Sequence, residues 1–227
     1  LVEKKNAREL VVNAVKRFRG VSWEVLKIRP DIIVQGETLD RAGRGADYLY
    51  TMAKKCELAG VDIFVSHSWR DSGEVKWARL SEWCEDFKTD QGRPPILWLD
   101  KVCICQTNIM ADLPCLPVFL AGCNGILVLA GITYATRLWC IVEVFVYLAV
   151  ESVDDAEETT SAATIVLLLV ENQEVWPYEL RNLVESWRSF DAEACECFNS
   201  RDKERMLAVI GGGNGGLVNF NRTVSEL

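Results

Sequence analysis

The chain has 227 residues, and 49% of them are hydrophobic, which is enough to fill the core of one large domain. Charged residues make up 26% of the chain and only 6 prolines and 15 glycines occur, so the composition excludes a collagen-like or broadly disordered protein. The 33 acidic residues outnumber the 25 basic ones and give a formal charge of -8, which disfavours nucleic acid as a partner because its phosphates attract basic surfaces.

The first sixty residues, 1–60, differ in pattern from the rest of the chain and predict a helical N-terminal extension. A basic amphipathic helix is expected around Val2–Phe18, and a second helix is expected to end near Leu58. Both helices are expected to pack on the domain that follows them.

From Val61 onward, short apolar runs alternate with helical patterns, which is typical of strand–helix–strand units on a parallel sheet. Each run is rich in branched or aromatic residues and almost continuously apolar, as expected where helices cover both faces of a sheet. We therefore expect no half-exposed edge among the four predicted strands. These strands are Val61–Ser66, Ile96–Asp100, Ile126–Ala130 and Thr164–Val170.

Helical patterns lie between and after these strands. Apolar residues recur at three- and four-residue intervals from Val75 to Phe87 and predict one helix, with Asp71 or Ser72 as its cap and Gly92 beyond its end. The other expected helices are Ala111–Ala121, Tyr134–Glu151, Trp176–Phe190 and Arg201–Ile210.

The end of the chain is less regular. A fifth strand is indicated around Ala194–Phe198. The glycine-rich run from Gly211 to Gly216 lacks the lysine and serine or threonine that end a phosphate-binding loop. We therefore expect an α/β domain over 61–210 and a glycine-rich tail or linker over 211–227.

Neither a membrane span nor a metal site is predicted. The longest apolar run, Leu116–Ile132, is broken by two glycines and an asparagine, so it does not predict a transmembrane helix. The 9 cysteines are an odd number scattered through apolar segments, which favours reduced thiols in a cytoplasmic protein. The pairs Cys103/Cys105 and Cys195/Cys197 lack the usual spacing of zinc ligands, and the chain has 1 histidine.

One acidic residue lies in the most apolar stretch of the chain. Glu143 is the only charged residue within 138–150. A helix this apolar is buried on most sides, so the pKa of Glu143 is expected to rise unless a cation or a cleft supports the charge. Trp139 lies four residues earlier and shares the helical face of Glu143. This pattern favours a functional acid; the alternative is an ion pair with Arg137 or Arg70, with Trp139 filling core space.

In open parallel sheets, ligands bind beyond the carboxyl ends of the strands. The residues that follow the first two strands of the predicted domain are dense in hydrogen-bond donors, acceptors and aromatic rings, which indicates a cleft, although loops that only cap a sheet can have the same composition. After the first strand these residues are Ser66, His67, Ser68, Trp69 and Arg70, and after the second they are Asp100 and Lys101.

Four segments carry a family resemblance. They read VDIFVSHSWRD from Val61, ILWLDKVCICQ from Ile96, ILVLAG from Ile126 and YATRLWCIVEVF from Tyr134. Their order resembles the Toll/interleukin-1 receptor (TIR) domain superfamily, and the Trp-Cys-x-x-Glu that ends at Glu143 is similar to the motif of the catalytic glutamate in its NAD-cleaving members. The WLDKVCICQ segment is also similar to fungal heterokaryon-incompatibility domains, which share this fold.

The resemblance implies a flavodoxin-like parallel sheet with helices on both faces. It also implies cleavage of NAD or NADP, consumed as a substrate and not held as a cofactor, or homotypic self-association in immune and cell-death signalling. Residue by residue, it implies that Glu143 is the catalytic acid and that Trp139 is a wall of the nicotinamide pocket. The loop from Ser66 to Arg70 would then bind substrate, and the segment from Asp100 to Gln106, which includes Lys101, would gate the site.

Two other functions remain open from the residues. One is a non-catalytic scaffold that signals through homotypic oligomerisation, which N-terminal helices covering the site would favour. The other is a hydrolase with Cys103 or Cys105 as nucleophile and His67 as base. Ser66 and His67 are adjacent in a strand and point to opposite faces, so they do not predict a catalytic dyad.

Overall fold

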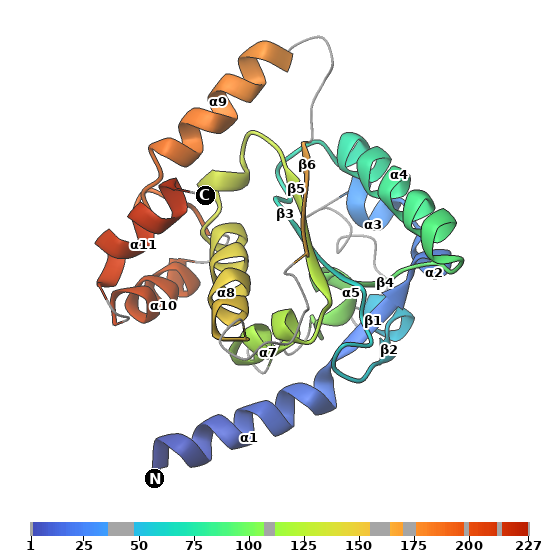
Figure 1. Ribbon diagram of the computed structural model, residues 1–227, viewed down its shortest axis with the longest axis horizontal. Coiled ribbons are helices and arrows are strands. Elements are labelled where there is room, and N and C mark those ends of the chain that lie inside the picture. The colour runs from blue at the N-terminus through green and yellow to red at the C-terminus, as the bar shows by residue number, and fades with distance from the viewer. Residues whose placement is uncertain are drawn as a thin grey trace.

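The computed structural model describes residues 2–35, 48–106, 112–154, 164–169, 176–197, 200–212 and 215–226. Its centre is a mixed sheet of six strands in the order β2-β1-β4-β3-β5-β6 (Figure 1). β3, β4, β5 and β6 are mutually parallel, whereas β1 is antiparallel to both of its neighbours. The strands are β1 (Arg19–Ser22), β2 (Lys54–Lys55), β3 (Ile63–His67), β4 (Ile96–Trp98), β5 (Gly125–Ala130) and β6 (Thr164–Leu169).

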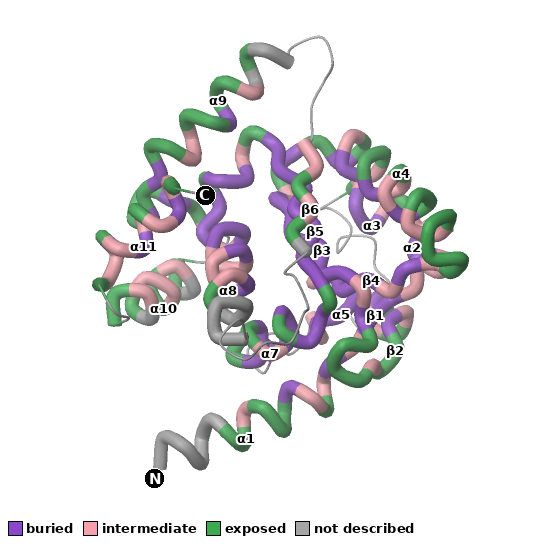
Figure 2. Tube along the Cα trace, viewed as in Figure 1, coloured by how far each residue is buried: buried purple, intermediate pink, exposed green. Residues whose placement is uncertain are grey.

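The four parallel strands confirm the predicted α/β class and lie within two residues of their predicted positions. Every residue of β3 and of β5 is buried, as expected for strands whose nearly continuous apolar sequence is covered on both faces. Figure 2 shows the buried residues concentrated in these central strands and in the start of the neighbouring helix α8 (Leu138–Asp154). The core therefore sits between the middle of the sheet and its covering helices.

Helices cover both faces of the sheet (Figure 1). α4 (Gly73–Gln91) lies on one face and α8 on the other. The Ser72 hydroxyl caps α4 by accepting a hydrogen bond from the Val75 N–H, and Gly92 follows the helix in a left-handed conformation, as the sequence predicts. The remaining helices are α1 (Val2–Arg17), α2 (Trp23–Leu26), α3 (Asp31–Val34), η2 (Leu49–Met52), α5 (Asp100–Cys103), η3 (Leu113–Cys115), α7 (Leu116–Ala121), η4 (Tyr134–Thr136), α9 (Trp176–Arg188), α10 (Ser200–Gly211) and α11 (Gly216–Ser225).

The expectation that no strand forms a half-exposed edge is wrong for β6. Ile165 is 42% exposed and Leu167 is 58% exposed. In the described part of the chain, β6 pairs only with β5 and ends the sheet. The fifth strand indicated around Ala194–Phe198 does not extend it, because residue 198 lies outside the described residues and Glu196 forms only an isolated bridge with Arg137.

The sequence predicts a helical N-terminal extension, but the extension also contains β1 and β2, which join the sheet. β1 pairs with β4, with Val21 opposite Leu97, and this pairing continues the sheet across the predicted boundary at residue 60. Gly20 allows the close approach, since a Cβ atom there would lie 2.6 Å from Cγ2 of Ile96. Periodicity did not reveal a strand of four residues between two helical patterns.

The end of the chain also differs from the expected tail or linker over 211–227. Gly215 and Gly216 have φ values of 81° and 58°, so the glycines supply left-handed turns. Helix α11 then begins at Gly216, and its Phe220 and Val224 side chains are buried. The Phe220 ring contacts Phe145 of α8 edge-on at 4.7 Å between centroids, so this segment is part of the packed structure.

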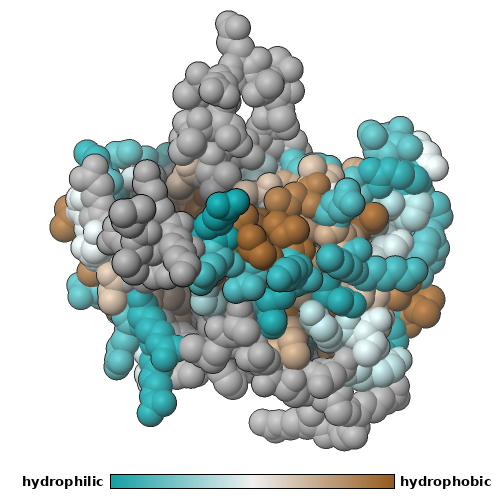
Figure 3. Space-filling view, turned by 90° about the horizontal axis from the view of Figure 1, so that it is seen from below, coloured by the Kyte–Doolittle hydropathy of each residue, from teal (hydrophilic) through white to brown (hydrophobic). Residues whose placement is uncertain are grey.

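The surface seen from below has apolar side chains gathered at the centre of the face and hydrophilic ones beside them (Figure 3). Among the helices in the described ranges, none has both the length and the apolarity that a bilayer crossing requires. All 9 cysteines are free thiols.

Gly73 begins α4 where α3 crosses it. A Cβ atom on Gly73 would lie 2.3 Å from the Val34 carbonyl oxygen and 2.6 Å from the Val34 Cα atom. Because both atoms belong to the backbone, no rotamer change relieves the clash, and Gly73→Ala should lower the free energy of unfolding by about 1–3 kcal/mol. Chemical denaturation measures the change.

Gly211→Ala is the matched control for Gly73→Ala. Gly211 is exposed at the end of α10, and a Cβ atom there meets nothing within 4 Å. The control should be neutral or slightly stabilising, because alanine restricts the unfolded chain more than glycine does. Equal losses of stability in both variants would contradict the close α3–α4 contact.

Candidate functional site

The carboxyl ends of β3 and β5 lie side by side at the centre of the sheet. The chain leaves β3 toward β4 on one side and returns to β5 on the other, so these two strands flank the point where the strand order changes direction. Such a point is where open parallel sheets bind ligands. The loops that follow His67 and Ala130 therefore lie at the expected ligand-binding position.

A chain of hydrogen bonds joins β3, η4 and α8 at this point. The Ser66 hydroxyl donates to Oε2 of Glu143 over 2.5 Å. The same hydroxyl lies 2.7 Å from the Tyr134 hydroxyl. Tyr134 in turn donates to the Cys140 carbonyl oxygen over 3.2 Å. Ser66 and Glu143 were predicted from the sequence, whereas Tyr134 was not.

Glu143 combines a buried carboxyl group with a partly accessible side chain. The residue is half-buried, but protein surrounds its carboxyl group. Burial raises the pKa of Glu143 to about 8, the hydrogen bond from Ser66 acts in the opposite direction, and the negative charge of Asp100 raises the pKa further. The predicted rise in the pKa of Glu143 thus follows mainly from loss of hydration.

Among the described residues, Glu143 does not form the alternative ion pair with Arg70 or Arg137. Arg70 pairs with Glu196, and Nη1 of Arg137 lies 4.0 Å from the same Glu196 carboxylate. The Glu196 N–H also donates to the Thr136 carbonyl oxygen, which holds this segment beside the start of α8. Both arginines therefore have another acid, and no ion pair involving Glu143 occurs among the described residues.

Trp139 stands one helical turn before Glu143 on α8. Both residues are half-buried, and Trp139 packs against the core on one side. The spacing of four residues places the indole and the carboxylate on the same helical face, as predicted. An aromatic surface therefore adjoins the acid.

Four of the other predicted substrate-binding residues form a second group on the opposite face of the sheet: His67, Trp69, Asp100 and Lys101. His67 meets the Trp69 ring edge-on at 4.1 Å, and the Trp69 indole N–H donates to Asp100 over 3.0 Å. Lys101 Nζ lies 4.5 Å from the centre of the Trp69 ring. Because side chains alternate along β3, Ser66 joins Glu143 while His67 joins this second group. The structure divides the predicted site in two.

Lys76 of α4 belongs to the second group and was missed in the sequence. It is fully buried, and its ammonium donates to the Ser68 carbonyl oxygen over 2.6 Å. Burial lowers the pKa of Lys76 to about 8. Its spacing of four and eight residues from Leu80 and Cys84, which are also buried, was the signal that could have placed it on the inner face of α4.

The loops after β3 and β5 are tied together by side chains. The Ser68 hydroxyl lies 2.7 Å from that of Thr133, which donates to Asp71 over 2.7 Å. Gly131 leaves room for this contact, since a Cβ atom there would lie 2.3 Å from the Asp71 carboxyl carbon. These contacts fix the backbone on either side of Ser66 and Tyr134.

A thiol–imidazole pair does not form among the described residues. Neither ring nitrogen of His67 has a hydrogen-bond partner there, and burial holds the pKa of His67 well below its usual value. Cys103 contacts the Leu97 carbonyl oxygen, and burial raises the pKa of this thiol to about 12. A nucleophilic cysteine needs a lowered pKa, so the environment of Cys103 disfavours that role. Within the described residues, no cluster of three or more His, Cys, Asp or Glu side chains could hold a metal ion.

The raised pKa of Glu143 makes folding stability depend on pH. The folded chain keeps a proton on Glu143 up to about pH 8, whereas the unfolded chain releases it near 4.5. The stabilisation of the protonated form is therefore complete below about pH 4.5 and is lost as the pH rises through about 8. Glu143→Gln cannot ionise. As the pH rises between these two values, its free energy of unfolding should therefore increase relative to that of the wild type by up to about 1.4 kcal/mol per pH unit.

Urea unfolding of both proteins at several pH values from about 5 to about 9 measures this difference in the free energy of unfolding. Glu185→Gln, on the exposed side of α9, is the control and should follow the wild type at every pH. Parallel curves for the wild type and Glu143→Gln would show that the carboxyl group of Glu143 is hydrated.

No family model, curated protein or solved structure matches the chain. The function is therefore inferred from the side chains around Glu143 and from the chemistry that they can perform.

Proposed function

We propose that the protein cleaves the bond between nicotinamide and ribose in NAD or NADP, with Glu143 as the catalytic residue. One observation carries this proposal. Glu143 is a half-buried residue at the carboxyl edge of the central parallel strands, and a serine hydroxyl, not a cation, binds its carboxylate. The negative charge of the ionised form therefore remains available to a positively charged reaction centre.

The reaction needs only one carboxylate. Nicotinamide in NAD is already cationic, so no acid must protonate the leaving group, in contrast to ordinary glycosides with their paired carboxylates. The bond from the ribose carbon to the ring nitrogen breaks, and its electron pair leaves with neutral nicotinamide. Water then adds to the oxocarbenium-like ribosyl centre and releases a proton. The ionised Glu143 would stabilise the positive charge on the sugar during this step.

The neighbouring residues suit the parts of such a substrate. Trp139 would offer its indole to the cationic pyridinium ring, an attraction that aromatic faces provide. Arg70 lies half-exposed at the same end of the sheet, where its guanidinium could meet a phosphate in place of Glu196. The group around Trp69 and Lys101 would support the loops at the edge of the site.

The strand order supports a TIR-like fold for the domain. Taken alone, the parallel strands run β4-β3-β5-β6, which is the order 2-1-3-4 of a flavodoxin-like sheet. The two added strands at the β4 edge distinguish this chain from a simple sheet of that kind. We infer homotypic self-association in the cytoplasm as the setting in which such a domain would act in immune or cell-death signalling.

Purified full chain, at high concentration and mixed with NAD or NADP, should release nicotinamide, which chromatography measures. Glu143→Gln should lower the rate by at least about 100-fold, because it keeps the shape of the side chain and removes its charge. Trp139→Ala should raise KM. Glu185→Gln should leave the rate unchanged. Persistent inactivity of the wild type, or full activity of Glu143→Gln, would count against the proposal.

The activity should also depend on pH in a defined direction. The ionised form of Glu143 is the reactive one, and burial raises the pKa of this group to about 8. The rate should therefore rise as the pH increases through about 8 and level off above it. A rate that falls over this range would assign Glu143 the role of a proton donor instead.

The alternative of a non-catalytic scaffold has one observation in its favour, the exposed apolar side chains of Ile165 and Leu167 on the edge strand β6. A scaffold would also be favoured if N-terminal helices covered the site. Among the described residues, the first of these helices, α1, packs against α7 and η3 instead. The Glu143→Gln variant separates the two functions, since a scaffold would retain its self-association without any nicotinamide release.

A further inference from the structure

The hydroxyl groups of Ser66 and Tyr134 form a buried relay beside Glu143. Ser66 is 1% exposed and Tyr134 is 0% exposed, so bulk water does not compete for their hydrogen bonds. Each hydroxyl carries one proton and can donate one hydrogen bond. In the relay from Glu143 through Ser66 and Tyr134 to the Cys140 carbonyl oxygen, the contact between the two hydroxyls can therefore carry its proton in only two ways, donated by Ser66 or donated by Tyr134.

The two arrangements correspond to the two ionisation states of Glu143. When Glu143 is ionised, Ser66 must donate to it, and Tyr134 satisfies the Ser66 oxygen only by turning its proton away from the Cys140 carbonyl oxygen and toward Ser66. When Glu143 is protonated, it can donate to Ser66, Ser66 to Tyr134, and Tyr134 to the Cys140 carbonyl oxygen. The direction of the Tyr134 proton is thus coupled to the charge on Glu143.

We propose that Tyr134 is a positioning residue that acts on Glu143 through Ser66: its buried hydroxyl turns the Ser66 proton toward the carboxylate and so fixes the ionised Glu143 in its reactive orientation. This inference rests on the proposed function for its catalytic meaning. Tyr134 does not touch the carboxylate itself, and its effect is transmitted by one intervening hydroxyl.

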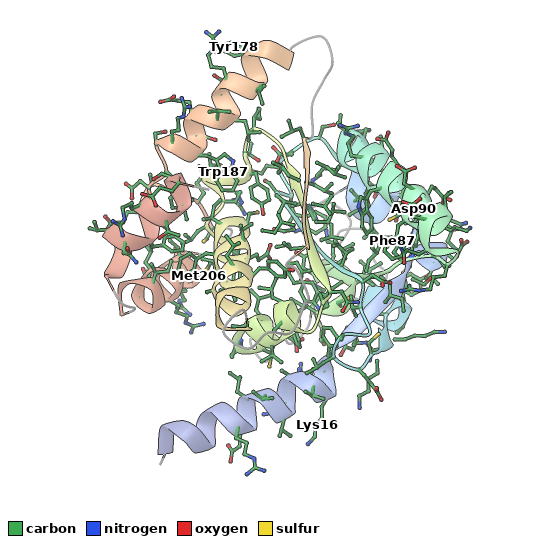
Figure 4. The ribbon with its side chains drawn as sticks, in the orientation of Figure 1. Lys16, Phe87, Asp90, Tyr178, Trp187 and Met206 are labelled. Atoms are coloured by element: carbon green, nitrogen blue, oxygen red, sulfur yellow. The ribbon has the colours of Figure 1, made fainter. Side chains whose placement is uncertain are left out.

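The phenol ring is held in place independently of the relay. Trp187 of α9 stacks on Tyr134 with the ring centres 5.9 Å apart and the planes 17° from parallel. Figure 4 shows Trp187 on the side of α9 that faces the start of α8, whereas Tyr178 of the same helix points away. Replacing only the hydroxyl should therefore leave the ring in position.

Few other titratable groups face Glu143 from the elements around it. Asp100, the first residue of α5, raises the pKa of Glu143 through its charge, and its own carboxylate accepts from Trp69 and from the Lys101 N–H. Cys140 on α8 is a buried thiol whose pKa burial raises well above the usual value. Helix α7, which packs against α8, contributes none. Within the described ranges, Ser66 donates the hydrogen bond that reaches the Glu143 carboxylate.

The titration of Glu143 gives a readout that does not require activity. We would label the glutamate side-chain carboxyl carbons with carbon-13 in the full chain, assign the Glu143 signal from its loss in Glu143→Gln, and follow its shift with pH. Ser66→Ala removes the donor to the carboxylate and should move the midpoint upward by about one pH unit. Tyr134→Phe should move it in the same direction by a smaller amount.

The double variant decides between a relay and a structural role. If Tyr134 acts only through Ser66, Tyr134→Phe should shift the midpoint in the wild type but not in the Ser66→Ala background. Ser66→Thr keeps a hydroxyl and should restore the wild-type midpoint. Ser68→Ala is the matched control, because Ser68 is also 1% exposed but bonds to Thr133, and it should leave the midpoint in place.

The same variants extend to nicotinamide release. Tyr134→Phe should lower kcat near pH 7 by several-fold and leave KM unchanged, since it alters the charge state and orientation of Glu143 and not the surface that binds substrate. Two results would overturn the relay. One is that Tyr134→Phe shifts the Glu143 titration midpoint equally in the wild type and in Ser66→Ala. The other is that Ser66→Ala leaves this midpoint unchanged. A wild type that releases no nicotinamide but obeys the double-variant test would overturn the proposed function and leave the relay standing.

Discussion

The hydrogen bond from Ser66 to Glu143 is the interaction on which the candidate site depends. It joins the carboxyl end of the central strand β3 to the apolar helix α8, and it gives the Glu143 carboxylate a hydrogen-bond donor. A buried carboxylate with a single hydroxyl donor is costly to ionise, which is why burial raises the pKa of Glu143 to about 8. The same cost makes the charge strongly attractive to a cation that enters the site, because little else compensates it.

The alternation of side chains along β3 decides which residues share the site with this acid. Ser66 points to the α8 face, and His67 points to the α4 face, where it meets Trp69. Lys76 lies near the same Trp69 ring. The two faces differ in charge: among the described residues no ion pair reaches Glu143, whereas the other face holds two buried lysines near Asp100. The second group therefore stabilises the loops, while the first retains an uncompensated acid.

The sequence predicted the parallel strands and Glu143 because both depend on local patterns, namely continuous apolar runs and one charge in an apolar helix. It did not predict β1, whose Val21 and Ser22 pair with β4 and whose Gly20 leaves room for the Ile96 side chain. Tyr134 and Glu196 were also missed, since their partners lie 68 and 126 residues away along the chain. A contact of that kind is decided by the register of distant elements, which no window of sequence contains.

Glu196 is the acid that both arginines near the start of α8 contact. Arg70 and Arg137 both pair with Glu196 beside the start of α8, the helix that carries Glu143. The segment that carries Glu196 is fixed to the start of α8 by backbone hydrogen bonds to Thr136 and from Leu138, so its carboxylate meets both guanidinium groups first. Glu143 is left with Ser66, and Ser66 with Tyr134. A protein that needed Glu143 only for stability would gain from the opposite pairing, because a buried acid without a cation lowers stability as the pH rises.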